Sequence, residues 1–385
     1  MTQVIFTERC DYMKVVAAID SFKGSMTSME AGNAVKKGIL AAKPDAEVVV
    51  NPLADGGEGT VDALIEGLGA KKIPVTVTGP LGEKVSCYYG FLEETKTAVM
   101  EMASAAGITL VIKKDPLRAS TYGVGEMIAD ALKRGCKNFM IGIGGSATND
   151  GGIGMLKALG FEFFDEDGND VGEGAAALAK IEVIQTENKN PLLSGAKFQI
   201  ACDVKNPLCG KQGATYIFGS QKGVTEEQKS KVDEAMKHYA DVTKESLGCD
   251  FADCEGAGAA GGLGYAFLSY LAGELIPGVE LILHATGLEE KMKNADVVVT
   301  GEGRLDAQTV MGKAPVGVAA LAKKYNAKVI AFAGSVAPEA SVCNQAGIDA
   351  FFPIVRGVTT LEEAMKKENA MENIAATAEQ VFRLL

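Results

Sequence analysis

Residues 139–152 read FMIGIGGSATNDGG, and this stretch indicates the class of fold. A short apolar strand at 139–143 runs directly into a glycine-rich turn, and a helical pattern follows at 153–159. Uninterrupted apolar strands between helices are typical of parallel sheets that are covered on both faces. In such sheets ligands bind beyond the carboxyl ends of the strands. The stretch therefore predicts an α/β fold with a ligand site at its turn.

The same strand pattern recurs along the chain, and helix signals separate the strands. The other apolar runs end at or near glycine, an acidic residue or arginine, and they lie at 15–19, 48–50, 198–201, 297–300, 329–333 and 351–355. Helix starts are marked by a threonine with a glutamate or glutamine three residues later, as in a capping box. These pairs are Thr27 with Glu30, Thr225 with Gln228, and Thr360 with Glu363, and the last pair is predicted to open the last long helix.

The region from 74 to 99 differs, because glycines punctuate its short apolar stretches. That pattern predicts hairpins, and therefore an antiparallel or mixed sheet. We predict a Rossmann-like parallel-sheet α/β domain formed by 13–75 and 265–385. It is interrupted by a second α/β domain with a mixed sheet at 76–264, and 1–12 form an N-terminal extension. A simple division into two halves is the alternative.

Composition excludes several classes of function. The chain has 47% apolar and 23% charged residues, which is typical of a globular protein. Its net charge of −12 argues against nucleic acid or an anionic membrane as partner, because both require a basic surface. No apolar run reaches the roughly 18 residues of a membrane span. The eight cysteines are scattered singly, as reduced thiols of a cytoplasmic protein are.

Two glycine-rich stretches also contain carboxylates. In residues 54–60, ADGGEGT, Asp55 and Glu58 are candidates to hold a cation, although an ordinary tight turn has the same pattern. In 301–306, GEGRLD, two carboxylates and Arg304 suit a metal-bound phosphate, and a surface salt-bridge cluster is the alternative. Neither this stretch nor the glycine-lysine pairs at 210–211 and 312–313 complete a Walker A motif.

The glycine turn at 142–152 has several interpretations. Successive amides, two hydroxyl groups and a following helix predict a cradle for an anion such as phosphate. The same letters match G-x-G-x-x-A with Glu162 downstream, which would indicate an NAD(P)-dependent dehydrogenase of a small hydroxy acid. The third interpretation is a turn with a purely structural role. Residues 256–264 match G-x-G-x-x-G, but an acidic segment precedes them, so helix packing or a hinge competes with ligand contact.

With only two histidines in the chain, the available chemistry consists of carboxylates, lysine, arginine, hydroxyl groups and amides. That inventory fits phosphoryl transfer. The chain also resembles the bacterial type I glycerate kinase family from Met13 onward. The resemblance rests on the motifs at 20–23 (DSFK), 54–60, 78–85 (TGPLGEKV), 141–152, 201–204 with 206–208 (ACDV, NPL), 256–264 and 300–304 (TGEGR).

The resemblance implies phosphorylation of D-glycerate by ATP with Mg²⁺, and 2-phosphoglycerate is the product associated with this type. It also implies a Rossmann-like domain interrupted by a second α/β domain, with the site between them. The sequence alone leaves 2- or 3-phosphoglycerate open, and monomer or homodimer as well. Two departures from the family pattern, Ile19 and Ser220 in place of prolines, affect local backbone rigidity and not the reaction.

Residue roles are hypotheses drawn from these motifs. The ATP phosphates are assigned to Gly144, Gly145, Ser146, Thr148 and Asn149. Lys23 and Arg304 are assigned to neutralise the transferring group or the glycerate carboxylate. Asp55 and Glu302 are the Mg²⁺ candidates. Asp203 is the candidate to orient or deprotonate the attacking hydroxyl group, with Asp20 in reserve.

Overall fold

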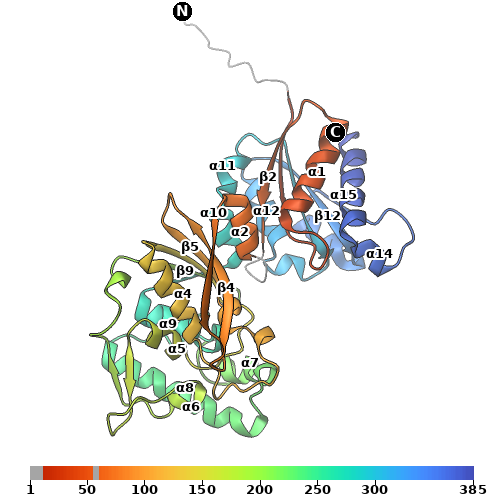
Figure 1. Cartoon of the computed structure of the whole chain (residues 1–385). Coiled ribbons are helices and arrows are strands. Elements are labelled where there is room, and N and C mark those ends of the chain that lie inside the picture. The colour runs from red at the N-terminus through yellow and green to blue at the C-terminus, as the bar shows by residue number, and fades with distance from the viewer. Residues whose placement is uncertain (1–11, 55–59) are drawn as a thin grey trace, which may run out of the picture. The chain divides into compact units, whose positions relative to one another are not determined.

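The computed structural model describes residues 12–54 and 60–385, which form two compact units (Figure 1). The first unit contains residues 12–54 and 283–385, and the second contains 60–282. These limits differ from the predicted 13–75, 76–264 and 265–385. The difference arises because β3 (Lys71–Thr78) and β10 (Glu274–Ile276) both pair within the sheet of the second unit.

A five-stranded sheet forms the centre of the first unit, and every pairing in it is parallel. The strand order is β13-β12-β11-β1-β2. The strands are β1 (Lys14–Ile19), β2 (Glu47–Pro52), β11 (Val297–Leu305), β12 (Lys328–Val336) and β13 (Ala350–Pro353). The parallel sheet predicted from the continuous apolar runs is therefore confirmed.

Two long helices pack together on one face of this sheet, α1 (Ser28–Ala42) and α15 (Lys367–Phe382). Alternate residues of β1 form one apolar cluster with them, while α12 (Ala314–Lys323) packs on β11 and β12 outside that cluster. The remaining helices are α11 (Leu288–Met292), η4 (Thr309–Met311), η5 (Pro338–Ser341), α13 (Val342–Gln345) and α14 (Leu361–Met365), while α10 (Gly278–Ala285) begins in the second unit and ends in the first.

Two of the three predicted helix starts are confirmed, whereas Thr360 and Glu363 begin the short α14 and the last long helix, α15, begins at Lys367. Thr27 Oγ1 accepts a hydrogen bond from Glu30 N at 3.2 Å, and Glu30 Oε2 accepts from Thr27 N at 3.0 Å. This reciprocal capping box satisfies two of the N–H groups that a helix start leaves without partners. Thr225 and Gln228 form a second capping box at the start of α8 (Glu226–Leu247).

The second unit is built on a six-stranded mixed sheet, as predicted. Its order is β10-β9-β6-β5-β4-β3; β3, β4 and β5 pair antiparallel and the others parallel. Its other strands are β4 (Lys84–Leu92), β5 (Thr97–Glu101), β6 (Asn138–Gly142) and β9 (Lys197–Ala201), with a separate pair β7 (Glu162–Phe164) and β8 (Val183–Gln185). Its helices are α2 (Thr60–Leu68), α3 (Ala103–Ala106), η1 (Ile108–Leu110), α4 (Tyr122–Lys133), α5 (Ile153–Ala158), α6 (Ala175–Leu178), η2 (Pro191–Leu193), α7 (Ala214–Lys222), α8, η3 (Ala259–Gly261) and α9 (Leu263–Leu271).

An aromatic core holds the parallel half of this sheet together. Phe139 on β6 stacks on Phe198 on β9, with ring centroids 4.8 Å apart. Because β6 and β9 are parallel neighbours, the loops that follow them emerge side by side at one edge of the sheet. Those loops carry the central glycine turn and Asp203. None of the helices within 12–54 and 60–385 is long and apolar enough to cross a membrane.

Candidate active site

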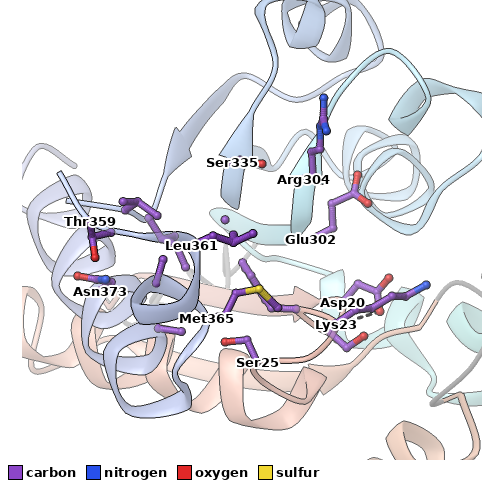
Figure 2. A pocket seen from close by; sticks show the side chains of 18 of the residues that line it. Asp20, Lys23, Ser25, Glu302, Arg304, Ser335, Thr359, Leu361, Met365 and Asn373 are labelled. Carbon is purple, nitrogen blue, oxygen red and sulfur yellow. Dashed lines mark hydrogen bonds between the residues drawn. The ribbon is translucent and has the colours of Figure 1, made fainter. Parts of the chain in front are cut away.

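The first unit contains a pocket of about 650 Å³ at the carboxyl ends of β1, β11 and β12 (Figure 2). The pocket brings together four of the predicted site residues, Asp20, Lys23, Glu302 and Arg304, and Lys313 joins them. In Figure 2 these predicted residues lie on one side of the pocket. The opposite side is formed largely by α14, α15 and the segment before them, with Thr359, Leu361, Met365 and Asn373 labelled.

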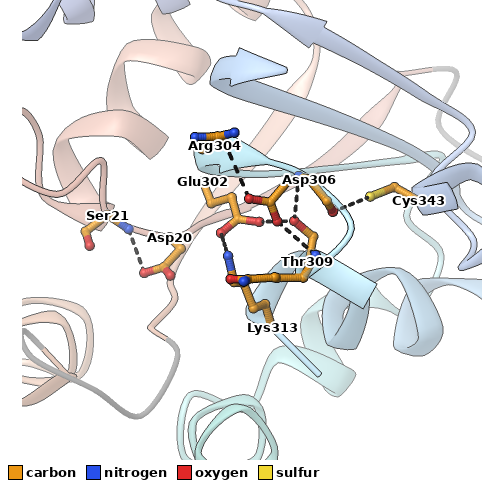
Figure 3. Close-up of polar contacts among 9 residues, drawn as sticks. Asp20, Ser21, Glu302, Arg304, Asp306, Thr309, Lys313 and Cys343 are labelled. Carbon is orange, nitrogen blue, oxygen red and sulfur yellow. Dashed lines mark hydrogen bonds and ion pairs between the residues drawn. The ribbon is translucent and has the colours of Figure 1, made fainter. Parts of the chain in front are cut away.

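Glu302 is the most constrained carboxylate of this pocket (Figure 3). Only 8% of the residue is exposed. Thr309 Oγ1 donates to its Oε1 at 2.6 Å, and Lys313 Nζ lies 3.4 Å from its Oε2. Burial raises the pKa of Glu302, whereas the hydrogen bond from Thr309 and the charge of Lys313 oppose that rise. The side chain is thus held in one orientation at the end of β11.

Asp20 and Arg304 show opposite degrees of burial. Asp20 follows β1 directly, is 5% exposed, and accepts a hydrogen bond from Ser21 N at 2.7 Å. The Arg304 side chain is 66% exposed, and its Nε lies 3.6 Å from Asp306 Oδ2. Exposed ion pairs of this kind are weak, so the guanidinium can exchange this partner for an anionic ligand. The pocket therefore combines buried carboxylates, whose positions are fixed, with an exposed guanidinium group that can move to a ligand.

Of the two predicted Mg²⁺ ligands, the structure describes Glu302. Asp55 lies outside the described residues. Within the described part of the chain, no three histidine, cysteine, aspartate or glutamate side chains gather as a metal site. Mg²⁺ in enzymes that bind phosphates is commonly held by one or two carboxylates and completed by phosphate oxygens and water. The hard oxygen atoms of Glu302 fit that kind of site.

The second unit contains a pocket of about 420 Å³ where β6 and β9 end. Gly144, Gly145 and Ser146 line it from the first loop, and Asp203 lines it from the second. Asp203 Oδ1 accepts a hydrogen bond of 2.8 Å from Gly278 N, at the start of α10. Four residues that the sequence analysis assigned to phosphate binding and to the base therefore share one pocket.

Thr148 and Asn149, predicted to bind the ATP phosphates, are fully buried and do not line this pocket. Asn149 Nδ2 donates to Thr215 Oγ1 at 3.0 Å, which ties the turn to α7. Within the described residues, Thr148 Oγ1 and Asn149 Oδ1 are buried without a hydrogen-bond partner. Both side chains therefore lie inside the turn rather than on the pocket wall, and Asn149 connects the turn to α7.

Asp150 anchors the end of the same turn. It is fully buried and accepts hydrogen bonds from Thr121 N and Oγ1, both at 2.8 Å, and from the amides of Gly152 and Gly154 at 3.1 and 3.3 Å. Burial raises the pKa of Asp150, and these four donors oppose the rise. The carboxylate joins the starts of α4 and α5 to the turn.

The glycine-rich stretch 256–264 packs against the central turn. Gly261 adopts a left-handed φ of +69°, and an added Cβ atom would lie 2.1 Å from the Thr148 carbonyl oxygen. Gly151 N donates to Gly261 O at 2.9 Å. Ala259 and Ala260, by contrast, line the pocket. Close packing, which the sequence left open, is therefore the role of the glycine at 261.

Lys222 is a pocket residue that the sequence analysis missed. It is 2% exposed, and its Nζ donates to Ser146 Oγ and to Thr148 O, each at 2.7 Å. Burial lowers the pKa of Lys222 to about 7, although the charge of Asp150 opposes that shift. The only local signal was a lysine that ends a helix before glycine, and that pattern normally indicates no more than a helix C-terminus.

Two α/β units whose pockets combine glycine turns, lysines and carboxylates are typical of a phosphoryl-transfer enzyme. A sequence model described as the glycerate kinase family matches residues 15–385. The chain is 45% identical to a glycerate kinase of Bacillus subtilis (strain 168), covering 96% of this chain and 97% of that protein. It is also 45% identical to a glycerate 2-kinase of Escherichia coli (strain K12), covering 95% and 98%.

A crystal structure of a Salmonella typhimurium LT2 protein assigned as glycerate kinase 2 superposes with a TM-score of 0.89. Its sequence is 42% identical, and the match covers 97% of this chain and 98% of that one. This chain therefore belongs to the glycerate kinase family. The resemblance seen in the sequence is confirmed, and these relatives do not support the alternative of an NAD(P)-dependent dehydrogenase.

Proposed function

We propose that the protein transfers the γ-phosphoryl group of ATP to the 2-hydroxyl group of D-glycerate. The observation that carries this proposal is the pocket of the first unit, where Lys23, Arg304 and Lys313 meet the buried carboxylates Asp20 and Glu302. Phosphoryl transfer depends on positioning and on charge neutralisation rather than on covalent catalysis. The name of the Escherichia coli relative, glycerate 2-kinase, supports the 2-position.

The test is incubation of the protein with D-glycerate, ATP and Mg²⁺, followed by identification of the phosphorylated isomer by ³¹P and ¹³C NMR. We expect 2-phosphoglycerate together with one equivalent of ADP. Formation of 3-phosphoglycerate would contradict the assigned position only. ATP hydrolysis that does not depend on glycerate, or no turnover at all, would contradict the whole proposal.

In the second unit, we assign the ATP phosphates to the amides of Gly144 and Gly145 and to the hydroxyl group of Ser146. Gly145 has a φ of +72°, a conformation that turns successive amides toward one side and that side chains disfavour. Thr148 and Asn149 then contribute by holding the turn. Asp203, in the same pocket, is assigned to orient or deprotonate the attacking hydroxyl group, with Asp20 of the other pocket as the reserve.

Lys23 is assigned, with Arg304, to the glycerate carboxylate or the transferring group. We expect Lys23→Met to lower kcat/KM for D-glycerate about 10- to 100-fold, because a charge-assisted contact to an anion is lost. Lys37→Met is the matched control, since Lys37 is exposed on α1 and does not line the pocket. Steady-state kinetics with varied D-glycerate checks this. Equal kcat/KM values for the two variants would show that Lys23 does not contact the substrate.

We assign Mg²⁺ to Glu302, with Asp55 as the second candidate ligand. Bound there, the ion would supply charge neutralisation for the nucleotide phosphates. Because Thr309 orients Glu302, we expect Thr309→Val to raise the half-saturating Mg²⁺ concentration about 10-fold, which is a typical effect of losing a partner of a ligand. Thr309→Ser keeps the hydroxyl group and should behave like the wild type. Activity measured over a Mg²⁺ titration decides between these outcomes, and an unchanged titration for Thr309→Val would exclude this role.

We also propose a cytoplasmic location and a monomer or homodimer. All seven cysteines in the described part of the chain are unpaired, as is usual in a reducing compartment. Light scattering coupled to size-exclusion chromatography would distinguish a monomer from a homodimer.

A further inference from the structure

Lys222 is buried, although burial of a charged lysine is energetically unfavourable and no contacting carboxylate among the described residues offsets that penalty. Transferring an ammonium group from water to a protein interior is strongly unfavourable unless an opposite charge compensates it. The two acceptors of Lys222 are a hydroxyl group and a carbonyl oxygen, and both are neutral. Within 12–54 and 60–385, no carboxylate contacts its Nζ atom. The lysine therefore lacks a contacting counter-ion.

Two carboxylates of the neighbouring loops, Asp150 and Asp203, already accept hydrogen bonds from other donors. Asp150, in the loop after β6, receives four hydrogen bonds from Thr121, Gly152 and Gly154. Asp203, in the loop after β9, lines the same pocket as Lys222 and accepts from Gly278 N. Asp150 favours the charged lysine at a distance, but neither carboxylate pairs with it.

The pocket itself is built for an anion. Lys222 lines it beside Gly144, Gly145 and Ser146, so a ligand that enters can meet backbone amides, a hydroxyl group and an ammonium group together. The ammonium group carries one more N–H than its two bonds within the protein use. A phosphate oxygen that accepts this N–H would supply the missing negative charge.

We propose that Lys222 is a phosphate-binding residue of this enzyme, and that its ammonium group contacts an oxygen of the ATP triphosphate at the Gly144–Ser146 turn. This inference rests on the proposed function, because it takes ATP as the ligand of the turn. It adds a residue on α7 to a site that the sequence assigned to the loops alone. Ser146, which accepts from Lys222, then links the turn to that helix.

The binding experiment compares Lys222→Met with wild type by calorimetric titration of ATP and, separately, of inorganic tripolyphosphate. We expect both affinities to fall about 10- to 100-fold in Lys222→Met, because a charge-assisted hydrogen bond in a buried site is lost. Lys222→Arg should retain part of the affinity. Lys237→Met, an exposed lysine of α8 outside the pocket, is the control and should bind as wild type does. Unchanged affinity in a folded Lys222→Met protein would overturn the proposal.

A second measurement uses the wild-type protein, so it tests the proposal even if Lys222→Met does not fold. Without ligand, a lysine with a pKa of about 7 is mostly neutral near pH 8, whereas nucleotide phosphates are already fully ionised at about that pH. An adjacent phosphate raises the lysine pKa, so binding should draw in about one proton per ATP at that pH. Titrations in buffers of different ionisation enthalpy measure this number. No proton uptake would overturn the proposal.

The two proposals fail in distinguishable ways. If D-glycerate is phosphorylated but the affinities do not depend on Lys222 and ATP binding draws in no proton, only the role of Lys222 is wrong. If tripolyphosphate binding depends on Lys222 but D-glycerate is not phosphorylated, the proposed substrate is wrong and the phosphate site stands.

Discussion

Replacing Asp203 by asparagine is expected to lower kcat for D-glycerate phosphorylation by roughly 100-fold or more, with the fold retained. The substitution keeps the shape of the side chain and an oxygen that can accept from Gly278 N, as Asp203 Oδ1 does at 2.8 Å. It removes the negative charge and the ability to take up a proton. The measurement is kcat at saturating ATP and D-glycerate, with circular dichroism and thermal unfolding as the test of folding.

The alternative role for Asp203 is to cap the start of α10, where a carboxylate stabilises a helix by about 0.3–1 kcal/mol. Asp233→Asn is the matched control, because Asp233 also accepts from a backbone amide, that of Gly210, with both oxygens at 3.0 and 3.1 Å. Asp233 does not line the pocket, so its variant should keep normal turnover. If Asp203→Asn also keeps nearly normal turnover, Asp203 is structural and Asp20 becomes the candidate base.

The second large effect is expected from Gly261→Ala, which should destabilise the protein by about 3 kcal/mol or more. Two costs add at this position. The left-handed φ of +69° disfavours any side chain, and the new Cβ atom would lie 2.1 Å from the carbonyl oxygen of Thr148. Since Thr148 O also accepts from Lys222, the displaced backbone would disturb the pocket at the Gly144–Ser146 turn, where we propose that ATP binds. Urea unfolding and ATP titration should therefore both report the change.

Gly248→Ala separates the two costs. Gly248 has the same φ of +69°, but nothing lies within 4 Å of an added Cβ atom. This control should cost about 1–2 kcal/mol, the penalty of left-handed backbone alone, and should leave ATP affinity unchanged. If the two variants are equally stable and bind ATP equally well, the close contact between Gly261 and the turn contributes nothing to stability or to ATP binding.

Much of the fold was predictable because local patterns determine it. Continuous apolar runs such as 297–300 form strands that are buried in the parallel sheet. The capping boxes at Thr27 and Thr225 begin the helices predicted for them. The limits of the two units were not predictable in the same way. They depend on which strands pair, and residues 71–78 could join either sheet until their partner β4 was known.

The sequence by itself determined the family and the α/β class, and it identified the short motifs that line both pockets, because strand burial, glycine turns and helix caps depend on neighbouring residues. Which residues of those motifs line a pocket became clear from the folded structure alone. It placed Thr148 and Asn149 inside the turn and brought Lys222 to Ser146 from 76 residues away along the chain. The burial of a side chain and its contacts with distant residues follow from how helices and sheets pack, and no local pattern encodes that packing.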